Sequence, residues 1–106
     1  MGAGVGWWDA ATQTCTVPRG WALAPFGLTI LPVETLVVYG AFISDGLVYN
    51  HGTILNYGFM DSLRAFLNYG TIYNLCGARM MMPIVPVGGT LYGLHECTFL
   101  PLVLRE

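Results

Sequence analysis

The sequence predicts an all-β fold, a short β-solenoid of about four eighteen-residue coils with non-repeat arms at its N- and C-terminal ends. Three observations lead to this prediction. Apolar residues recur every six positions, glycine and asparagine recur in phase with them, and the best internal match lies eighteen residues along the chain. A period of six keeps the side-chain alternation of a strand in phase, whereas it drifts against the 3.6-residue period of a helix. Glycine and asparagine are also poor residues for a helix interior.

The six-residue period begins at Phe26. When the chain is divided into blocks of six from this residue, the fifth position is apolar in ten consecutive blocks, which a chain with 55% apolar residues rarely produces by chance. These positions are Ile30, Leu36, Phe42, Val48, Ile54, Met60, Phe66, Ile72, Ala78 and Ile84. Such a run predicts strands that repeat along most of the chain.

Two further columns accompany the apolar one. The third block position carries Gly40, Gly46, Gly52, Gly58 and Gly70, and the first carries Asn50, Asn56, Asn68 and Asn74. Asparagine side chains that stack in register can hydrogen-bond to one another. Both residue types also tolerate the left-handed backbone that we expect at the corners.

The eighteen-residue match defines the expected coil. Residues 44–61 align without gaps on residues 62–79, with six identical positions. If eighteen residues make one coil, equivalent residues stack about 4.8 Å apart along the axis. We therefore expect structural ladders formed by Asn50, Asn56, Asn68, Asn74, Gly52, Gly70, Ile54 and Ile72. The same register predicts that Asp61 stacks over Arg79, with opposite charges in contact.

The Asn-x-Gly-Thr-Ile cadence of this region resembles the repeats of β-helical adhesins and surface filament proteins. The six-residue period is similar to that of the hexapeptide-repeat left-handed β-helices. The resemblance covers about seventy residues and is strongest over residues 44–77. It departs from the left-handed pattern, in which glycine directly follows the aliphatic residue, because glycine here falls four residues after it. The resemblance implies architecture rather than ancestry and leaves the handedness of the coil open.

Both flanks depart from the repeat. The predicted organisation is an N-terminal arm or cap over residues 1–25, the repeat solenoid over residues 26–97 and an extended C-terminal tail over residues 98–106. Aromatic anchors are frequent at protein interfaces. The interface candidates are therefore Trp7, Trp8 and Trp21, although packing on their own domain is an open alternative.

Composition limits the classes of partner. Only 9% of the residues are charged and lysine is absent, whereas a typical soluble domain carries about 25% charged residues. A chain this poor in charge exposes much apolar surface unless it buries its outside against something. A net charge of −2 with four scattered arginines argues against nucleic acid. The most apolar window, residues 20–43, contains two prolines and Glu34, which disfavour a membrane-spanning helix.

Residues with catalytic or metal-binding chemistry are few. Cys15, Cys76 and Cys97 have spacings that match no metal motif, so buried thiols or one disulfide plus a free thiol are both open. The hexapeptide carbonic anhydrases need three histidines on zinc, but this chain has only His51 and His95. The eighteen-residue register places His51 above Tyr69. We expect no enzyme activity, catalytic residue, metal site or cofactor.

These observations predict a self-assembling structural subunit. With few charges available to protect its strand edges, each end of the solenoid is expected to be a ring of unpaired edges that stacks on the next copy. A head-to-tail contact that does not close generates a filament or surface fibre. The expected partners are copies of the same chain, with no small-molecule substrate. The expected location is extracellular or at the cell surface, although the N-terminus does not read as a conventional signal peptide.

Two alternatives accompany this expectation. The chain is alternatively a small structural subunit buried in a larger hetero-complex or virion, or a small membrane-associated protein.

Overall fold

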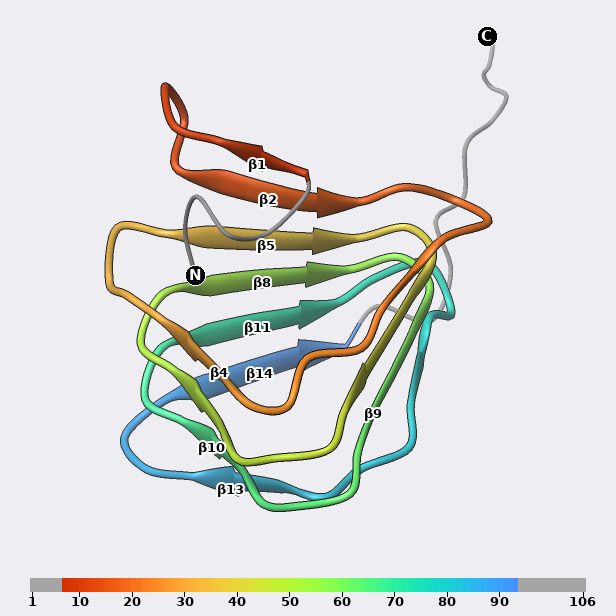
Figure 1. The fold of residues 1–106 in the computed structure, drawn as a ribbon. Helices are drawn as coiled ribbons and strands as arrows, with labels where there is room; N and C mark the ends of the chain where they lie inside the picture. The colour runs from red at the N-terminus through yellow and green to blue at the C-terminus, as the bar shows by residue number, and fades with distance from the viewer. Residues whose placement is uncertain (1–6, 94–106) are drawn as a thin grey trace, which may run out of the picture.

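The computed structural model describes residues 7–93, which form three β-sheets wound into a solenoid (Figure 1). Sheet A has the strand order β1-β2-β5-β8-β11-β14, sheet B the order β12-β9-β6-β3, and sheet C the order β13-β10-β7-β4. All neighbouring strands are parallel except β1 and β2. The described residues contain no helix, so the predicted all-β solenoid is confirmed.

Each coil passes through sheets A, B and C in turn. Coil 1 consists of β2 (Thr14–Val17), β3 (Ala22–Leu23) and β4 (Leu28–Ile30), and coil 2 of β5 (Thr35–Val38), β6 (Ala41–Ser44) and β7 (Val48–Asn50). Coil 3 consists of β8 (Thr53–Asn56), β9 (Phe59–Ser62) and β10 (Phe66–Asn68), and coil 4 of β11 (Thr71–Asn74), β12 (Arg79–Met80) and β13 (Ile84–Pro86). The strand β1 (Trp8–Asp9) precedes coil 1, and β14 (Thr90–Gly93) begins a fifth layer.

The eighteen-residue coil is confirmed in the middle of the molecule. Thr35 pairs with Thr53 and Thr53 pairs with Thr71 in sheet A, each eighteen residues on. The core follows from strand alternation, because every second side chain points inward. Eight successive members of the predicted apolar column, from Ile30 to Ile72, are fully buried. A column of inward side chains therefore runs along the axis as one continuous core.

The last part of that column differs from the prediction. The corner between β11 and β12, residues 75–78, holds two residues more than the corresponding corner of coil 3. As a result Met80, rather than Ala78, pairs with Met60. The same insertion moves Arg79 onto Phe59, while Asp61 pairs with Ile43. The predicted contact between Asp61 and Arg79 is therefore wrong.

The stacked sheets also extend into residues 1–25, the segment predicted to be an arm or a cap. Strand β2 pairs with β5 and β3 pairs with β6, and Cys15 and Val17 are fully buried. Coil 1 is longer than the others, since Thr14 pairs with Thr35 twenty-one residues on. Its longer corners interrupt the six-residue period, which is why the repeat is first recognisable at Phe26.

The two ends of the described solenoid are not flat. Sheet A contains six strands and sheets B and C contain four each, so sheet A extends further along the axis. At the N-terminal end β1 covers the edge of β2, with Trp8 opposite Cys15. The expected flat ring of strand edges is therefore modified in sheet A, whose edge is β1, whereas β3 and β4 are the edge strands of sheets B and C among the described residues. The predicted tail over residues 98–106 lies outside the described residues.

Candidate functional site

Two corners of the solenoid are built on buried asparagines. The Asn50 side chain is fully buried, and its Nδ2 donates to Asn68 Oδ1 at 2.9 Å and to the Thr71 carbonyl oxygen at 3.3 Å. Its Oδ1 accepts the backbone N–H of Gly52 at 3.1 Å. An asparagine that ends a strand can close a turn through the N–H two residues on, which is the contact made here. The side chain thus joins its own corner to the next coil.

The second asparagine corner lies between sheets A and B. Asn56 Nδ2 donates to Asn74 Oδ1 at 2.8 Å and to the Arg79 carbonyl oxygen at 3.1 Å, and Asn56 Oδ1 accepts the N–H of Gly58 at 3.0 Å. Asn74 is only half-buried and donates to the Ala78 carbonyl oxygen at 2.7 Å. The ladder of Asn50 and Asn68 therefore links coil 2 to coil 3, and the ladder of Asn56 and Asn74 links coil 3 to coil 4.

The corner glycines are required by close approach of the backbone. A Cβ added to Gly70 would overlap the carbonyl oxygen of Gly52, and one added to Gly52 would overlap that of Glu34. Neither residue has a positive φ, which among the described glycines occurs at Gly20, Gly27, Gly77 and Gly88. The expectation of a left-handed backbone at the repeating corners is therefore wrong. A side chain there is excluded by the coil stacked beneath.

Aromatic side chains stack along the axis at three places. The Tyr39 and Tyr57 ring centroids lie 5.0 Å apart, those of His51 and Tyr69 lie 4.5 Å apart, and those of Tyr73 and Tyr92 lie 5.1 Å apart. The interplanar angles are between 12° and 17°. His51 therefore stacks on Tyr69, as the predicted register requires. Within each stacked pair, the facing surfaces of the rings are covered.

The three tryptophans gather at the N-terminal end. Trp7 and Trp8 are half-buried against the core, whereas Trp21 is 62% exposed. The Trp7 and Trp21 rings meet edge to face with their centroids 5.8 Å apart. The Trp7 carbonyl oxygen also accepts the N–H of Thr16 at 3.3 Å, which holds this segment on β2. Two tryptophans thus pack on their own domain, and the third offers an exposed ring.

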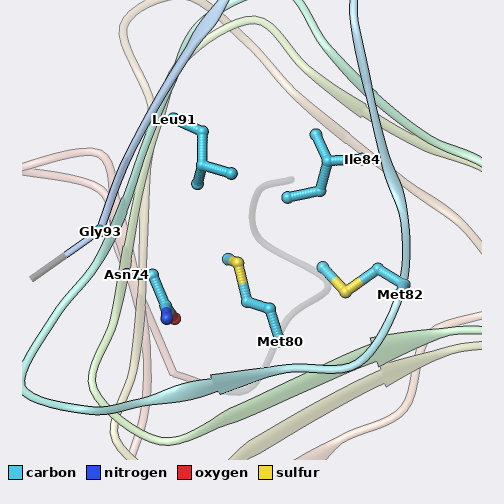
Figure 2. A pocket seen from close by; sticks show the side chains of 6 residues that line it. All are labelled: Asn74, Met80, Met82, Ile84, Leu91 and Gly93. Atoms are coloured by element: carbon cyan, nitrogen blue, oxygen red, sulfur yellow. The ribbon is translucent and has the colours of Figure 1, made fainter. Parts of the chain in front are cut away.

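The opposite end of the described core contains a cavity of about 400 Å³ (Figure 2). Its lining comes from coil 4 and β14 and consists of Asn74, Met80, Met82, Ile84, Leu91 and Gly93. Coil 4 is the last complete layer among the described residues, and β14 is the one described strand beyond it. Of the lining side chains Met82 is buried, whereas Leu91 is 51% exposed. The cavity is therefore mainly apolar, with the Asn74 amide as its one polar side chain.

The described residues include no group of three His, Cys, Asp or Glu side chains that could hold a metal ion.

Cys15 is a buried free thiol, and burial raises its pKa. Cys76 is disulfide-bonded. Glu34 is buried, and its carboxylate accepts the Leu31 N–H at 2.8 Å. Within residues 7–93, no helix has the length and apolar character needed to cross a membrane.

The register also creates a feature that the sequence reasoning missed. Five threonines stack in sheet A, one from each strand of the parallel ladder: Thr14, Thr35, Thr53, Thr71 and Thr90. Two residues further along the same strands lies a second column formed by Thr16, Val37, Leu55, Tyr73 and Tyr92. The sequence signal for this pair of columns is a threonine two residues before each member of the second column. Unequal coil lengths hide it from a strict six-residue or eighteen-residue comparison.

Comparison with known proteins adds no assignment. No family model matches the chain, and neither the curated proteins nor the solved structures contain a significant match.

Proposed function

We propose that this protein is a structural subunit that assembles with copies of itself, head to tail. The observation that carries the proposal is the difference between its two ends. Trp21 is exposed near the N-terminal end, and the C-terminal end of the described core contains a cavity lined largely by Met80, Met82, Ile84 and Leu91. The N-terminal end of one copy meets the C-terminal end of the next, with the tryptophan ring against the exposed Leu91 and the half-buried Met80.

The magnitude of such a contact sets how tight the assembly is. Burying a whole aromatic side chain removes about 150–250 Å² from water, worth roughly 4–6 kcal/mol at ~25 cal/mol per Å². Because Trp21 is 62% exposed in the subunit, docking it gains only part of this amount. Association itself costs about 4–15 kcal/mol. Further contacts at the same ends, such as Phe26 at 87% exposure and Leu91 at 51%, are therefore required.

The geometry of the sheets supports an open assembly. The contact joins two different surfaces, so each copy retains one free end of each kind and growth continues unless the rotation closes a ring. Sheet A extends furthest along the axis, so β14 of one copy meets the β1 end of the next within this sheet. The exposed side chains of coil 1 then fill the space alongside sheets B and C.

The Cys76 disulfide supports an extracellular or cell-surface location. Disulfides form and persist in oxidising compartments and are rare in the reducing cytosol. The remaining thiol in the described chain, Cys15, is buried and so is protected from exchange.

The test uses the purified full chain in a concentration series, observed by sedimentation velocity and cryo-electron microscopy. We expect fibres with an axial repeat of about 4.8 Å, the strand spacing. Trp21→Glu should block the N-terminal end and Leu91→Glu the C-terminal end. Ile43→Glu is the matched control, because Ile43 is 38% exposed on the side of the solenoid in sheet B.

Mixing the two end variants gives the sharper result. Each retains one intact end, so a one-to-one mixture should form dimers and nothing longer, while either variant alone stays monomeric. Discrete particles at every concentration of the unmodified chain would overturn the proposal. Solubility only with detergent or with a second protein would instead favour the membrane-associated or hetero-complex alternatives.

A further inference from the structure

The outer face of sheet A carries two regular columns of uncharged side chains. On its five parallel strands these columns are the five stacked threonines and the neighbouring column of Thr16, Val37, Leu55, Tyr73 and Tyr92, of which Val37 is buried. By contrast, the outer face of sheet B carries Asp61 and Arg79. Apart from Asp9, which lies opposite Thr14 on the edge strand β1, sheet A therefore presents an uncharged threonine column on one side of the molecule.

The threonine column is both regular and rigid. Neighbouring strands lie about 4.8 Å apart, so the five threonines repeat at that spacing. The inward neighbours Cys15, Leu36, Ile54 and Ile72 are fully buried, which fixes the strands that carry them. A β-branched side chain in a strand has a restricted χ1 angle. Thr35, Thr53, Thr71 and Thr90 therefore each present one hydroxyl and one methyl group in a repeating arrangement, whereas the Thr14 hydroxyl donates to the Thr12 carbonyl oxygen at 3.1 Å.

We propose that this threonine face binds ice. The oxygen atoms of hexagonal ice repeat along the crystal surface at a spacing close to that of β-strands, so successive hydroxyls can occupy equivalent places in the lattice. The methyl groups lie between them and order the intervening water. From Thr35 to Thr90 the column carries no charge, so no strongly bound hydration shell has to be removed along this stretch before the lattice is met. Asp9 lies opposite Thr14, at the N-terminal edge of the sheet. This activity is separate from the assembly through the ends.

The area of the face argues against a second copy as its occupant. Five strands at about 4.8 Å and four residues at about 3.4 Å cover only about 300 Å². A stable protein–protein interface buries about 800 Å² on each partner. A single threonine face is therefore less than half the size that a stable lateral dimer needs.

The aromatic geometry argues against a polysaccharide. Sugar rings bind over the exposed faces of aromatic rings, but Tyr73 and Tyr92 stack on each other at 5.1 Å, so their facing surfaces are covered. These two tyrosines also make the second column uneven at the C-terminal end. Val37, in the same column, is buried, so the second column is not open along its whole length. The threonine column is therefore the recognition element, and the bulky second column limits the strength of binding.

The test measures ice recrystallisation and the adsorption of fluorescently labelled protein to a growing ice crystal. The full chain is compared with Thr53→Lys, which places a charge in the centre of the threonine column. Leu67→Lys is the matched control, since Leu67 lies on the outer face of sheet C in the same coil. Trp21→Glu is present in all three proteins, so that assembly through the ends does not contribute. Circular dichroism and thermal unfolding verify that each variant is folded.

We expect the parent protein and Leu67→Lys to slow recrystallisation and adsorb to ice, and Thr53→Lys to lose both effects. Equal activity of the two lysine variants, or no activity of the parent, would overturn the proposal. If Thr53→Lys abolished a lateral association seen by sedimentation while the parent left ice unaffected, the face would belong to a second copy. If the parent bound insoluble cellulose or chitin and left ice unaffected, the ligand would be a polysaccharide.

Discussion

Replacing Asn50 with alanine should destabilise the solenoid more than most single substitutions. The Asn50 side chain makes three hydrogen bonds, to Asn68 Oδ1, the Thr71 carbonyl oxygen and the Gly52 N–H. It is fully buried, so water cannot take its place. Each buried polar group left without a partner costs about 1–3 kcal/mol. The expected loss of unfolding free energy is therefore roughly 3 kcal/mol or more, a large part of the ~5–15 kcal/mol typical of a domain.

Asn74 provides the internal comparison. It also lies in an asparagine ladder, but it makes two such bonds, accepting from Asn56 Nδ2 and donating to the Ala78 carbonyl oxygen. It is half-buried and lines the end cavity, so water can satisfy the groups that the substitution leaves. Asn74→Ala should therefore lower the free energy of unfolding by about 1 kcal/mol, which is the net contribution of a hydrogen bond whose partners water can reach.

The assay is urea and thermal unfolding of the full chain and both variants, followed by circular dichroism and tryptophan fluorescence. For a domain of this size, a loss of 3 kcal/mol lowers Tm by roughly 12–24 °C. Coincidence of the two probes checks that unfolding is two-state. If Asn50→Ala cost no more than Asn74→Ala, burial of the asparagine corner would not be the source of its contribution, and the reasoning would be refuted.

Three further predictions use the same unfolding measurements. Gly58→Ala should lower the free energy of unfolding by about 1–3 kcal/mol or more, because its Cβ would overlap the Gly40 carbonyl oxygen. Gly93 has open space around it, so Gly93→Ala should lower the free energy of unfolding by less than ~0.5 kcal/mol. Equal losses would contradict the close-approach argument. Because burial raises the pKa of Cys15, the unfolded chain ionises first, so unfolding free energy should fall as pH rises through the alkaline range. Cys15→Ala should reduce that fall, and an unchanged slope would rule out this thiol as its cause. Finally, Asp61→Ala and Arg79→Ala should be additive within about 0.5 kcal/mol, since the two residues are not paired in the register, and a larger coupling would show that they interact.

The core of this fold was predictable from the sequence because inward orientation depends on local alternation. Leu36, Ile54 and Ile72 stack in sheet A for the same reason that they recur in the sequence, which is that the coils between them have equal length. The same equality brings Asn50 over Asn68 and Asn56 over Asn74. Where coil length is constant, one period is sufficient to place every side chain.

The corners were less predictable because their length is not part of the period. Cys76 and Gly77 adopt φ values of 58° and 72° in a corner that holds two extra residues, and this places Arg79 over Phe59. Nothing in the apolar pattern signals that change, since corner residues lie outside the strands and carry no alternation. The threonine column escaped detection for the same reason: the steps from Thr14 to Thr35 and from Thr71 to Thr90 are longer than eighteen residues.

The stacking of one coil on the next has a consequence for how the length of such a molecule can change. In the parallel ladders each strand pairs only with the strands one coil before and one coil after it, so a copy of residues 44–61 inserted beside the original would meet the same pairing partners that already surround it. An in-frame duplication of this segment would lengthen the molecule by one strand spacing, about 4.8 Å, and leave both ends unaltered. Duplication of one coil at a time can therefore change the height of the solenoid in steps of one strand spacing.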